Sequence, residues 1–291
     1  ITALLGALIA VMFVGKVALG AQRWLDFGFF SYQPSESMKL ALVMVLARFM
    51  SQKSFPEGLG MKELALPLFG LIGIPFLITA EQPDLGTAMM LFITGGSILF
   101  FLKIKTKILV VVSFVIAIGG ISGWFFGLRD YQRDRVYTFL DPGRDPRGKG
   151  YNSIQSKIAV GSGQIVGKGF RKGTQSQLEF LPERHTDFIF SVLSEEHGFV
   201  GSITTVGLFA TMFLLGIRIA SQARDKAGAI LTVGVMAILF WHHFINIAMV
   251  IGLLPIVGVP LPLVSYGGSN MLTTMAALGL VSSVSYRKHM F

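Results

Sequence analysis

Residues 173–190 read GTQSQLEFLPERHTDFIF, and within them a hydrophilic stretch that begins near Arg129 gives way to an apolar run. Asp187 stands at that boundary, directly before Phe188. A carboxylate at the edge of a membrane is costly unless it is hydrated, paired with a cation or used in function. Asp187 is therefore the first candidate for a functional residue.

Outside this boundary the chain is strongly apolar, with 52% hydrophobic and only 14% charged residues. Soluble domains carry about 25% charged residues, whereas a membrane span needs roughly 20 consecutive apolar ones. Because lipid offers backbone groups no partner, we expect an all-α, polytopic helical integral membrane protein. We treat residues 1–291 as one membrane-embedded domain with a large extracytoplasmic loop over 129–186. The eight candidate spans are residues 1–19, 37–50, 62–80, 85–102, 107–128, 188–217, 228–254 and 269–286.

The basic residues predict the orientation of these spans. Every second loop is basic, as at Lys53 and Lys62 or at Arg218 and Arg224, and such loops are cytoplasmic. The net charge of +9 therefore follows membrane orientation and does not indicate nucleic-acid binding. The chain has no cysteine, which excludes disulfides and thiolate chemistry within it. The loops that face outward are 20–36, 81–85, the long polar stretch and 253–269.

The first two outward loops place polar residues at predicted helix starts. Pro34 suits a first helical turn and Ser35 can cap it. Glu36 and Lys39 are three residues apart, so they share a helix face, either as a structural ion pair or in contact with substrate. Arg23 is either an interfacial anchor or an anion ligand. Asp84 is most simply an N-cap of the next span.

The other two outward loops are less regular. The segment 252–269, which includes Ser265, combines three prolines with four glycines, and we expect either a re-entrant cavity wall or a tight loop. In the long stretch, 151–160 has helical spacing and suggests a helix on the membrane surface. The glycine-rich run 161–169 lacks the Lys-Ser/Thr of a nucleotide-binding loop. A basic field suited to an anionic headgroup, or to anionic lipid, comprises Lys157, Lys168, Arg171, Lys172 and Arg184.

Asp187 leaves three roles open: a helix N-cap, a general base, or a metal ligand. A helix N-terminus favours the ionised form, so a base there needs partial burial. Glu195 is roughly 12 Å further along a helix, so it cannot share an ion with Asp187. We expect Glu195 and Glu196 to be structural or to pair with basic groups on neighbouring spans.

Several motifs together resemble the SEDS family (shape, elongation, division and sporulation) of bacterial cell-wall polymerases. The resemblance runs in order along essentially the whole chain. It is closer to the elongation branch, the RodA-type proteins, than to the FtsW-type division branch, because Arg184 precedes the histidine and IQSKIAVGSG fills 154–163. The motifs are GAQRWLD at 20–26, QPSE at 33–36 with Lys39, QPDLGT at 82–87, GTQSQLEFLPERHTDFIF at 173–190, and GVPLPLVSYGG at 258–268.

This resemblance implies a ten-span fold of which the chain lacks the first two spans. It implies a peptidoglycan glycosyltransferase of the bacterial inner membrane, with its active site on the extracytoplasmic face. Two molecules of lipid II would be joined for cell elongation, with release of undecaprenyl pyrophosphate. The resemblance also implies a divalent cation (Mg²⁺ or Mn²⁺) and, as partners, membrane lipids, the elongation machinery and a class B penicillin-binding protein, a transpeptidase.

The family's essential aspartate matches Asp187, which is also our candidate metal ligand, and its buried ion pair matches Glu36 and Lys39. The alternatives are a lipid flippase or transporter, the division-type branch, and a non-catalytic scaffold. Against transport, the long outward loop has no counterpart in the other half of the chain, so no inverted repeat is visible. The expected substrate-binding residues are Arg23, Glu36, Lys39, Gln155, Lys157, Arg184 and Ser265.

Overall fold

The computed structural model describes residues 2–18, 21–26, 28, 31–82, 84–127, 130–144, 149–177, 181 and 183–288. Two compact units divide the chain. The first unit comprises Ile1–Leu109, Met212–Trp241 and Gly267–Phe291, and the second comprises Val110–Thr211 and His242–Tyr266.

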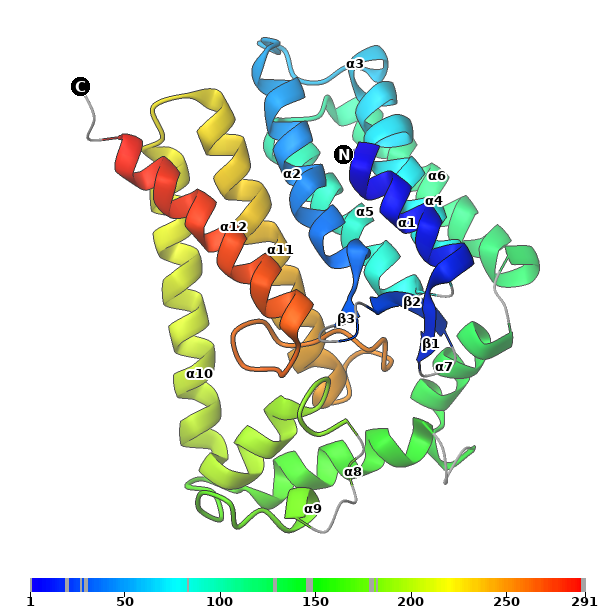
Figure 1. The fold of residues 1–291 in the computed structure, drawn as a ribbon, viewed down its shortest axis with the longest axis vertical. Helices are drawn as coiled ribbons and strands as arrows, with labels where there is room; N and C mark the ends of the chain where they lie inside the picture. The colour runs from blue at the N-terminus through cyan, green and yellow to red at the C-terminus, as the bar shows by residue number, and fades with distance from the viewer. Residues whose placement is uncertain are drawn as a thin grey trace. The chain divides into compact units, whose positions relative to one another are not determined.

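Each of the eight apolar runs folds as a helix (Figure 1). Four of the described helical segments are long and apolar enough to cross a membrane: Met61–Glu81, Thr106–Phe125, Ile189–Ser221 and Lys226–Val250. The count of eight spans stays a prediction. The eight runs become α1 (Thr2–Val14), α2 (Pro34–Ser51), α3 to α4 (Met61–Ala65 and Gly73–Glu81, joined by the π-helix Leu66–Ile72), α5 (Leu85–Phe101), α6 (Thr106–Ser122), α10 (Ile189–Ser221), α11 (Lys226–Val250) and α12 (Gly268–Arg287).

Helix α6 shows most directly that this is a membrane protein. None of its apolar window is buried inside the structure, and Val110, Phe114 and Ile121 are more than 60% exposed. Such a helix is soluble only when lipid covers it. The exposed apolar surface of α6 is therefore of the kind that a membrane-spanning helix presents to lipid.

In the first unit, α2 packs against α1, α5 and α12 (Figure 1). Glycines allow the helices to approach closely. A Cβ atom built on Gly234 of α11 would lie 2.4 Å from the Val43 side chain, and one on Gly95 of α5 would lie 2.5 Å from Ile72. Because helices in lipid associate through close packing, these two glycines are part of the unit's core.

A small antiparallel sheet that the sequence did not predict begins inside the first predicted span, residues 1–19, whose helix ends at Val14, and continues through the first outward loop. Its strands are β1 (Lys16–Ala18), β2 (Ala21–Asp26) and β3 (Ser31–Tyr32), in the order β1-β2-β3. After β3, Pro34 occupies the first turn of α2, as predicted. The expected cap is wrong: Gln33 is the N-cap, it makes no side-chain capping bond, and Ser35 is buried inside the first turn.

In the second unit, three helices of the polar stretch precede α10: α7 (Asp130–Leu140), α8 (Lys149–Ser162) and the short α9 (Thr174–Gln177). The helix predicted over 151–160 is present as α8. Ser156 fixes its inner face, because its hydroxyl donates to the Val250 carbonyl (2.6 Å) and bonds the Ser191 hydroxyl (3.0 Å).

The glycine-rich run 161–169 supplies backbone hydrogen-bond partners at a break in α10. The helix is interrupted at Gly198, where φ is 65° and ψ is −160°. The freed carbonyls of residues 195–196 accept from the backbone N–H groups of residues 168–169, at 3.0 and 2.9 Å. The freed N–H groups of residues 199–200 donate to the carbonyls of residues 164–165, at 2.8 and 3.0 Å. The exchange satisfies backbone groups that a broken helix would otherwise leave unpaired.

Glycine is required at this crossing because the two backbones touch. A Cβ atom on Gly163 would lie 1.9 Å from the Ser194 carbonyl oxygen, and one on Gly167 would lie 2.1 Å from the Glu196 oxygen. Contacts this short cannot be relieved by moving a side chain, since both partners are backbone. The run thus has a structural role, which agrees with the exclusion of a nucleotide loop.

Candidate functional site

Asp187 lies in a turn that precedes α10. The Glu183 carbonyl accepts from the N–H groups of Thr186 (3.1 Å) and Phe188 (3.3 Å), which closes the turn around Asp187. Phe188 is buried, whereas Asp187 is half-buried. The arrangement fixes the backbone of Asp187 while its carboxylate stays at a partly hydrated boundary.

The irregular segment after α11 is fastened to this turn. The Ser265 hydroxyl donates to the Thr186 carbonyl (2.6 Å) and accepts from the Leu261 N–H (2.7 Å), and the Tyr266 N–H donates to the His185 carbonyl (2.8 Å). Ser265 is only 3% exposed. Its position therefore explains how two loops are joined, and its contact with substrate stays a prediction.

Asn246 of α11 also bonds to both of these segments. It is fully buried, and its side-chain amide donates to the carbonyls of Asp187 (2.8 Å) and Val259 (2.7 Å). One amide group thus fixes the main chain at the candidate aspartate and in the facing segment. Asn246 was not predicted from the sequence, because an asparagine inside an apolar helix does not show which distant carbonyls it will bond.

Two glycines with positive φ leave room beside charged side chains. Gly258 (φ 75°) is placed so that an added Cβ atom would lie 3.3 Å from an Asp187 carboxylate oxygen. At Gly252 (φ 81°), an added Cβ atom would lie 2.0 Å from Cε and 2.7 Å from Nζ of Lys157. Lys157 and Asp187 therefore both lie against the segment between α11 and α12, and a cation and a carboxylate border the same loop.

The remaining basic residues of the second unit divide into different environments. The Arg184 guanidinium lies 3.2 Å from the His185 ring, beside the turn of Asp187. Gln155 is half-buried on α8. Lys168 does not belong to an open basic field, because its ammonium pairs with the fully buried Glu195 at 2.7 Å. The pairing expected for Glu195 is thus present, but its partner comes from the polar stretch and not from a neighbouring span.

The first unit holds the other predicted site residues. Glu36 and Lys39 form an ion pair with Nζ to Oε1 at 2.8 Å, and their side chains are only 6% and 1% exposed. This is the pairing that the i, i+3 spacing predicts. Removal of both groups from solvent makes each charge dependent on the other.

Arg23 belongs to a second polar cluster of the first unit. Its guanidinium lies 3.6 Å from the Asp84 carboxylate, which also accepts from the Gln33 amide (3.2 Å). Asp84 caps α5 as predicted, since its carboxylate accepts from the N–H of Thr87 (3.2 Å). The cluster ties β2, the start of α2 and α5 together, and Arg23 keeps 26% of its side chain exposed.

A divalent cation would find few protein ligands here. Among the residues that the structure describes, no group of three His, Asp or Glu side chains could hold a metal ion. The carboxylate of Asp187 faces the space that Gly258 leaves open, so it can offer one oxygen ligand. This donor set fits Mg²⁺, which keeps several waters and often takes one or two carboxylates plus substrate phosphates.

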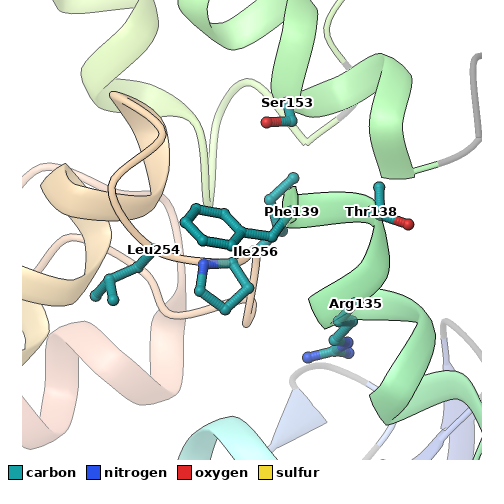
Figure 2. A pocket seen from close by; sticks show the side chains of 7 residues that line it. Arg135, Thr138, Phe139, Ser153, Leu254 and Ile256 are labelled. Carbon is teal, nitrogen blue, oxygen red and sulfur yellow. The ribbon is translucent and has the colours of Figure 1, made fainter. Parts of the chain in front are cut away.

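A small cavity of about 10 Å³ lies elsewhere in the second unit, between α7, α8 and residues 254–256 (Figure 2). Arg135 borders it and donates to the Val257 carbonyl (3.3 Å). The cavity has room for about one water molecule. None of the predicted site residues lines it.

Comparison with known proteins shows the family to which this chain belongs. Residues 1–290 match the model of the FtsW, RodA and SpoVE family, described as cell cycle proteins. The peptidoglycan glycosyltransferase MrdB of Escherichia coli K12 is 47% identical over 97% of this chain and 76% of its own length.

Two solved structures share the fold. A chain of a peptidoglycan synthase complex that coordinates polymerization and crosslinking superposes with a TM-score of 0.83 at 30% identity, over 100% of this chain and 80% of that one. The rod shape determining protein RodA of Thermus thermophilus gives a TM-score of 0.70 at 26% identity, over 99% of this chain and 77% of that one. This chain is a multi-pass membrane protein that belongs to the family of FtsW, RodA and SpoVE cell cycle proteins.

Proposed function

We propose that this protein is a peptidoglycan glycosyltransferase that polymerises lipid II for cell elongation. The observation that carries the proposal is the 47% identity, across 97% of the chain, to a protein named as such an enzyme. The higher similarity to MrdB and the likeness to RodA favour elongation over division. The experiment that tests it is polymerisation of purified lipid II by the reconstituted protein.

The reaction is a single displacement. The 4-hydroxyl oxygen of the acceptor sugar forms a bond to the donor's anomeric carbon, and the bond from that carbon to the pyrophosphate oxygen breaks. Its electron pair leaves with undecaprenyl pyrophosphate, and the hydroxyl proton passes to a base. An α-linked donor thus gives a β-linked product, so that one base suffices and no covalent sugar intermediate is needed.

Asp187 is the proposed base and Lys157 the proposed cation beside it. Both lie against the segment between α11 and α12, where Gly258 and Gly252 leave them space. The leaving pyrophosphate acquires charge, which a preorganised cation stabilises. Gln155 and Arg184 are proposed to bind substrate in the same unit. Arg23, Glu36 and Lys39 belong to the other unit, and their contact with substrate is likewise proposed.

Asn246 is proposed as a positioning residue for this base. The Asn246→Ala variant loses both hydrogen bonds that fix the carbonyls of Asp187 and Val259, so we expect kcat to fall about 10- to 100-fold with little change in KM, since misplaced groups of this kind cost about 10²-fold. The measurement is a lipid II titration at matched protein concentration. Asn270→Ala is the control, because the side-chain bond of Asn270 within the described part of the chain is to Thr274 of its own helix. Equal kcat values for wild type and Asn246→Ala would remove Asn246 from the site.

We further propose that polymerisation requires a divalent cation, Mg²⁺ or Mn²⁺, held by Asp187 and by oxygens of the substrate. When bound, such an ion would neutralise charge on the pyrophosphate. We expect an excess of chelator to stop polymerisation and added Mg²⁺ to restore it. Calorimetry on the protein without lipid II should show only weak Mg²⁺ binding, because the described residues offer no group of three or more side chains that could hold the ion. Full activity in chelator would disprove the requirement, and tight binding without lipid II would disprove the shared coordination.

The proposed location is the bacterial inner membrane, with Asp187 on the extracytoplasmic face. The proposed partner is a class B penicillin-binding protein, a transpeptidase that would crosslink the new strand within the elongation machinery. The likeness to a chain of a peptidoglycan synthase complex supports this partner.

The proposed orientation in the membrane can be tested with single introduced cysteines. Cysteines near Asp141 should react with an impermeant thiol reagent from outside, whereas cysteines near Lys105 should not.

A further inference from the structure

A groove of about 210 Å³ in the first unit lies at the helix ends that the sequence predicts to be cytoplasmic. The last turns of α2 and α12 and the first turns of α11 border it. Three arginines line the groove, and each comes from a different segment: Arg48 from α2, Arg224 from the turn before α11, and Arg287 from α12. All three side chains are exposed.

The groove carries a net positive charge. Its one acidic residue, Asp225, has its carboxylate turned to the start of α11, where it accepts from the Gly228 N–H (2.5 Å) and caps the helix. Lys226 and Lys288 are the sequence neighbours of the lining residues Asp225 and Arg287 and add further positive charge. An anion is therefore the favoured occupant on electrostatic grounds.

Apart from its charged residues, the groove has a mainly apolar lining. Met44 and Ala47 of α2, Leu231 of α11 and Val284 of α12 form this part of the groove. A free phosphate would leave these side chains uncovered. A phospholipid would cover them with an acyl chain while its phosphate bonds to guanidinium groups, which match phosphate oxygens two at a time.

We propose that this groove binds one anionic phospholipid, with its phosphate on the three arginines and an acyl chain along the apolar lining. The membrane setting supports this occupant, because anionic lipids are enriched in the leaflet that basic loops face and basic pockets between spans bind their headgroups. The bound lipid would connect α2, α11 and α12 at one end of the unit. The site is separate from the residues proposed for glycosyl transfer.

The test measures lipid binding to this protein in detergent by native mass spectrometry. Phosphatidylglycerol and phosphatidylcholine with the same acyl chains are titrated in parallel. Wild type should prefer phosphatidylglycerol at least tenfold, which corresponds to about 1.4 kcal/mol. The Arg48→Gln/Arg224→Gln/Arg287→Gln variant should lose this preference. The Leu231→Trp variant keeps every arginine but fills the groove, and it should lose binding as well.

A matched control removes the same charge elsewhere. Lys62, Lys103 and Lys107 are exposed and lie in or next to other loops predicted on the same side, so their triple replacement by glutamine should leave the preference intact. A loss equal to that of the arginine variant, or wild-type binding by Leu231→Trp, would assign the preference to surface charge and overturn the proposal. Competition by glycerol 3-phosphate at the concentration of the lipid would point to a soluble anion and overturn it too. Should the triple arginine variant aggregate, Arg287→Gln alone is read against Lys103→Gln, with the same criteria.

Discussion

We expect the Asp187→Asn variant to lose lipid II polymerisation by about 10²- to 10⁴-fold, the range over which general bases contribute. Asparagine has nearly the shape of aspartate but cannot accept a proton. The backbone bonds that close the turn do not involve the carboxylate, and Asn246 donates to the backbone carbonyl of Asp187, which the substitution keeps. The turn should therefore keep its structure while its chemistry is lost.

The measurement is the initial rate of glycan formation by the reconstituted protein, with the thermal unfolding midpoint recorded alongside. Asp134→Asn is the matched control, because Asp134 is an exposed aspartate of α7 in the same polar stretch. It should retain wild-type rates. Glycan synthesis by a folded Asp187→Asn protein at more than a tenth of the wild-type rate would exclude Asp187 as the base, and a large drop in its unfolding midpoint would assign it a structural role instead.

The features predicted correctly from the sequence are those that depend on neighbouring residues. Each apolar run became a helix, Pro34 starts α2, and Asp84 caps α5, because these features depend on a few neighbouring residues. The ion pair of Glu36 and Lys39 also depends only on helical spacing. The predicted cap was wrong: α2 begins at Pro34, so Gln33 takes the N-cap position and Ser35 lies buried inside the first turn.

Features that join distant segments of the chain could not be predicted from local sequence patterns. The break at Gly198 is stable only because residues 164–169 supply its missing backbone partners, about 30 positions earlier in the chain. The glycine-rich run was a visible signal of close backbone approach, but the sequence does not name what it approaches. For the same reason Lys168 was assigned to an open basic field, whereas it neutralises the buried Glu195.

The candidate site shows the same division. Asp187 was identifiable from its place at a polar boundary and from family resemblance. Its supports, Asn246 and the hydroxyl of Ser265, act through backbone carbonyls across 59 and 79 positions of sequence. Backbone acceptors are present at every residue, so no residue type marks them as the partners of a distant side chain.

The largest stability effects are expected at the ion pair of Glu36 and Lys39. Glu36→Ala removes the carboxylate that pairs with the buried Lys39 ammonium, and Lys39→Ala removes the ammonium that pairs with the buried Glu36 carboxylate, so each should destabilise the protein by about 3–5 kcal/mol. A charge swap, Glu36→Lys/Lys39→Glu, restores opposite charges at the same spacing and should recover part of the loss. Replacing both residues by apolar ones, Glu36→Leu/Lys39→Met, should also cost less than either single change, because no charge is then stranded.

The exposed pair of Lys105 and Glu57 provides the control within the same unit. Its ions are 3.1 Å apart, nearly as close as in the buried pair, but the side chains are 42% and 84% exposed. Water screens such a pair, so Glu57→Ala should change stability by less than about 1 kcal/mol. Unfolding midpoints of all variants are measured in one detergent, together with polymerisation rates. Single variants as stable as Glu57→Ala would mean that burial does not make Glu36 and Lys39 depend on each other. Single variants that stay stable but lose activity would mean that the pair serves substrate binding and not the stability of the protein.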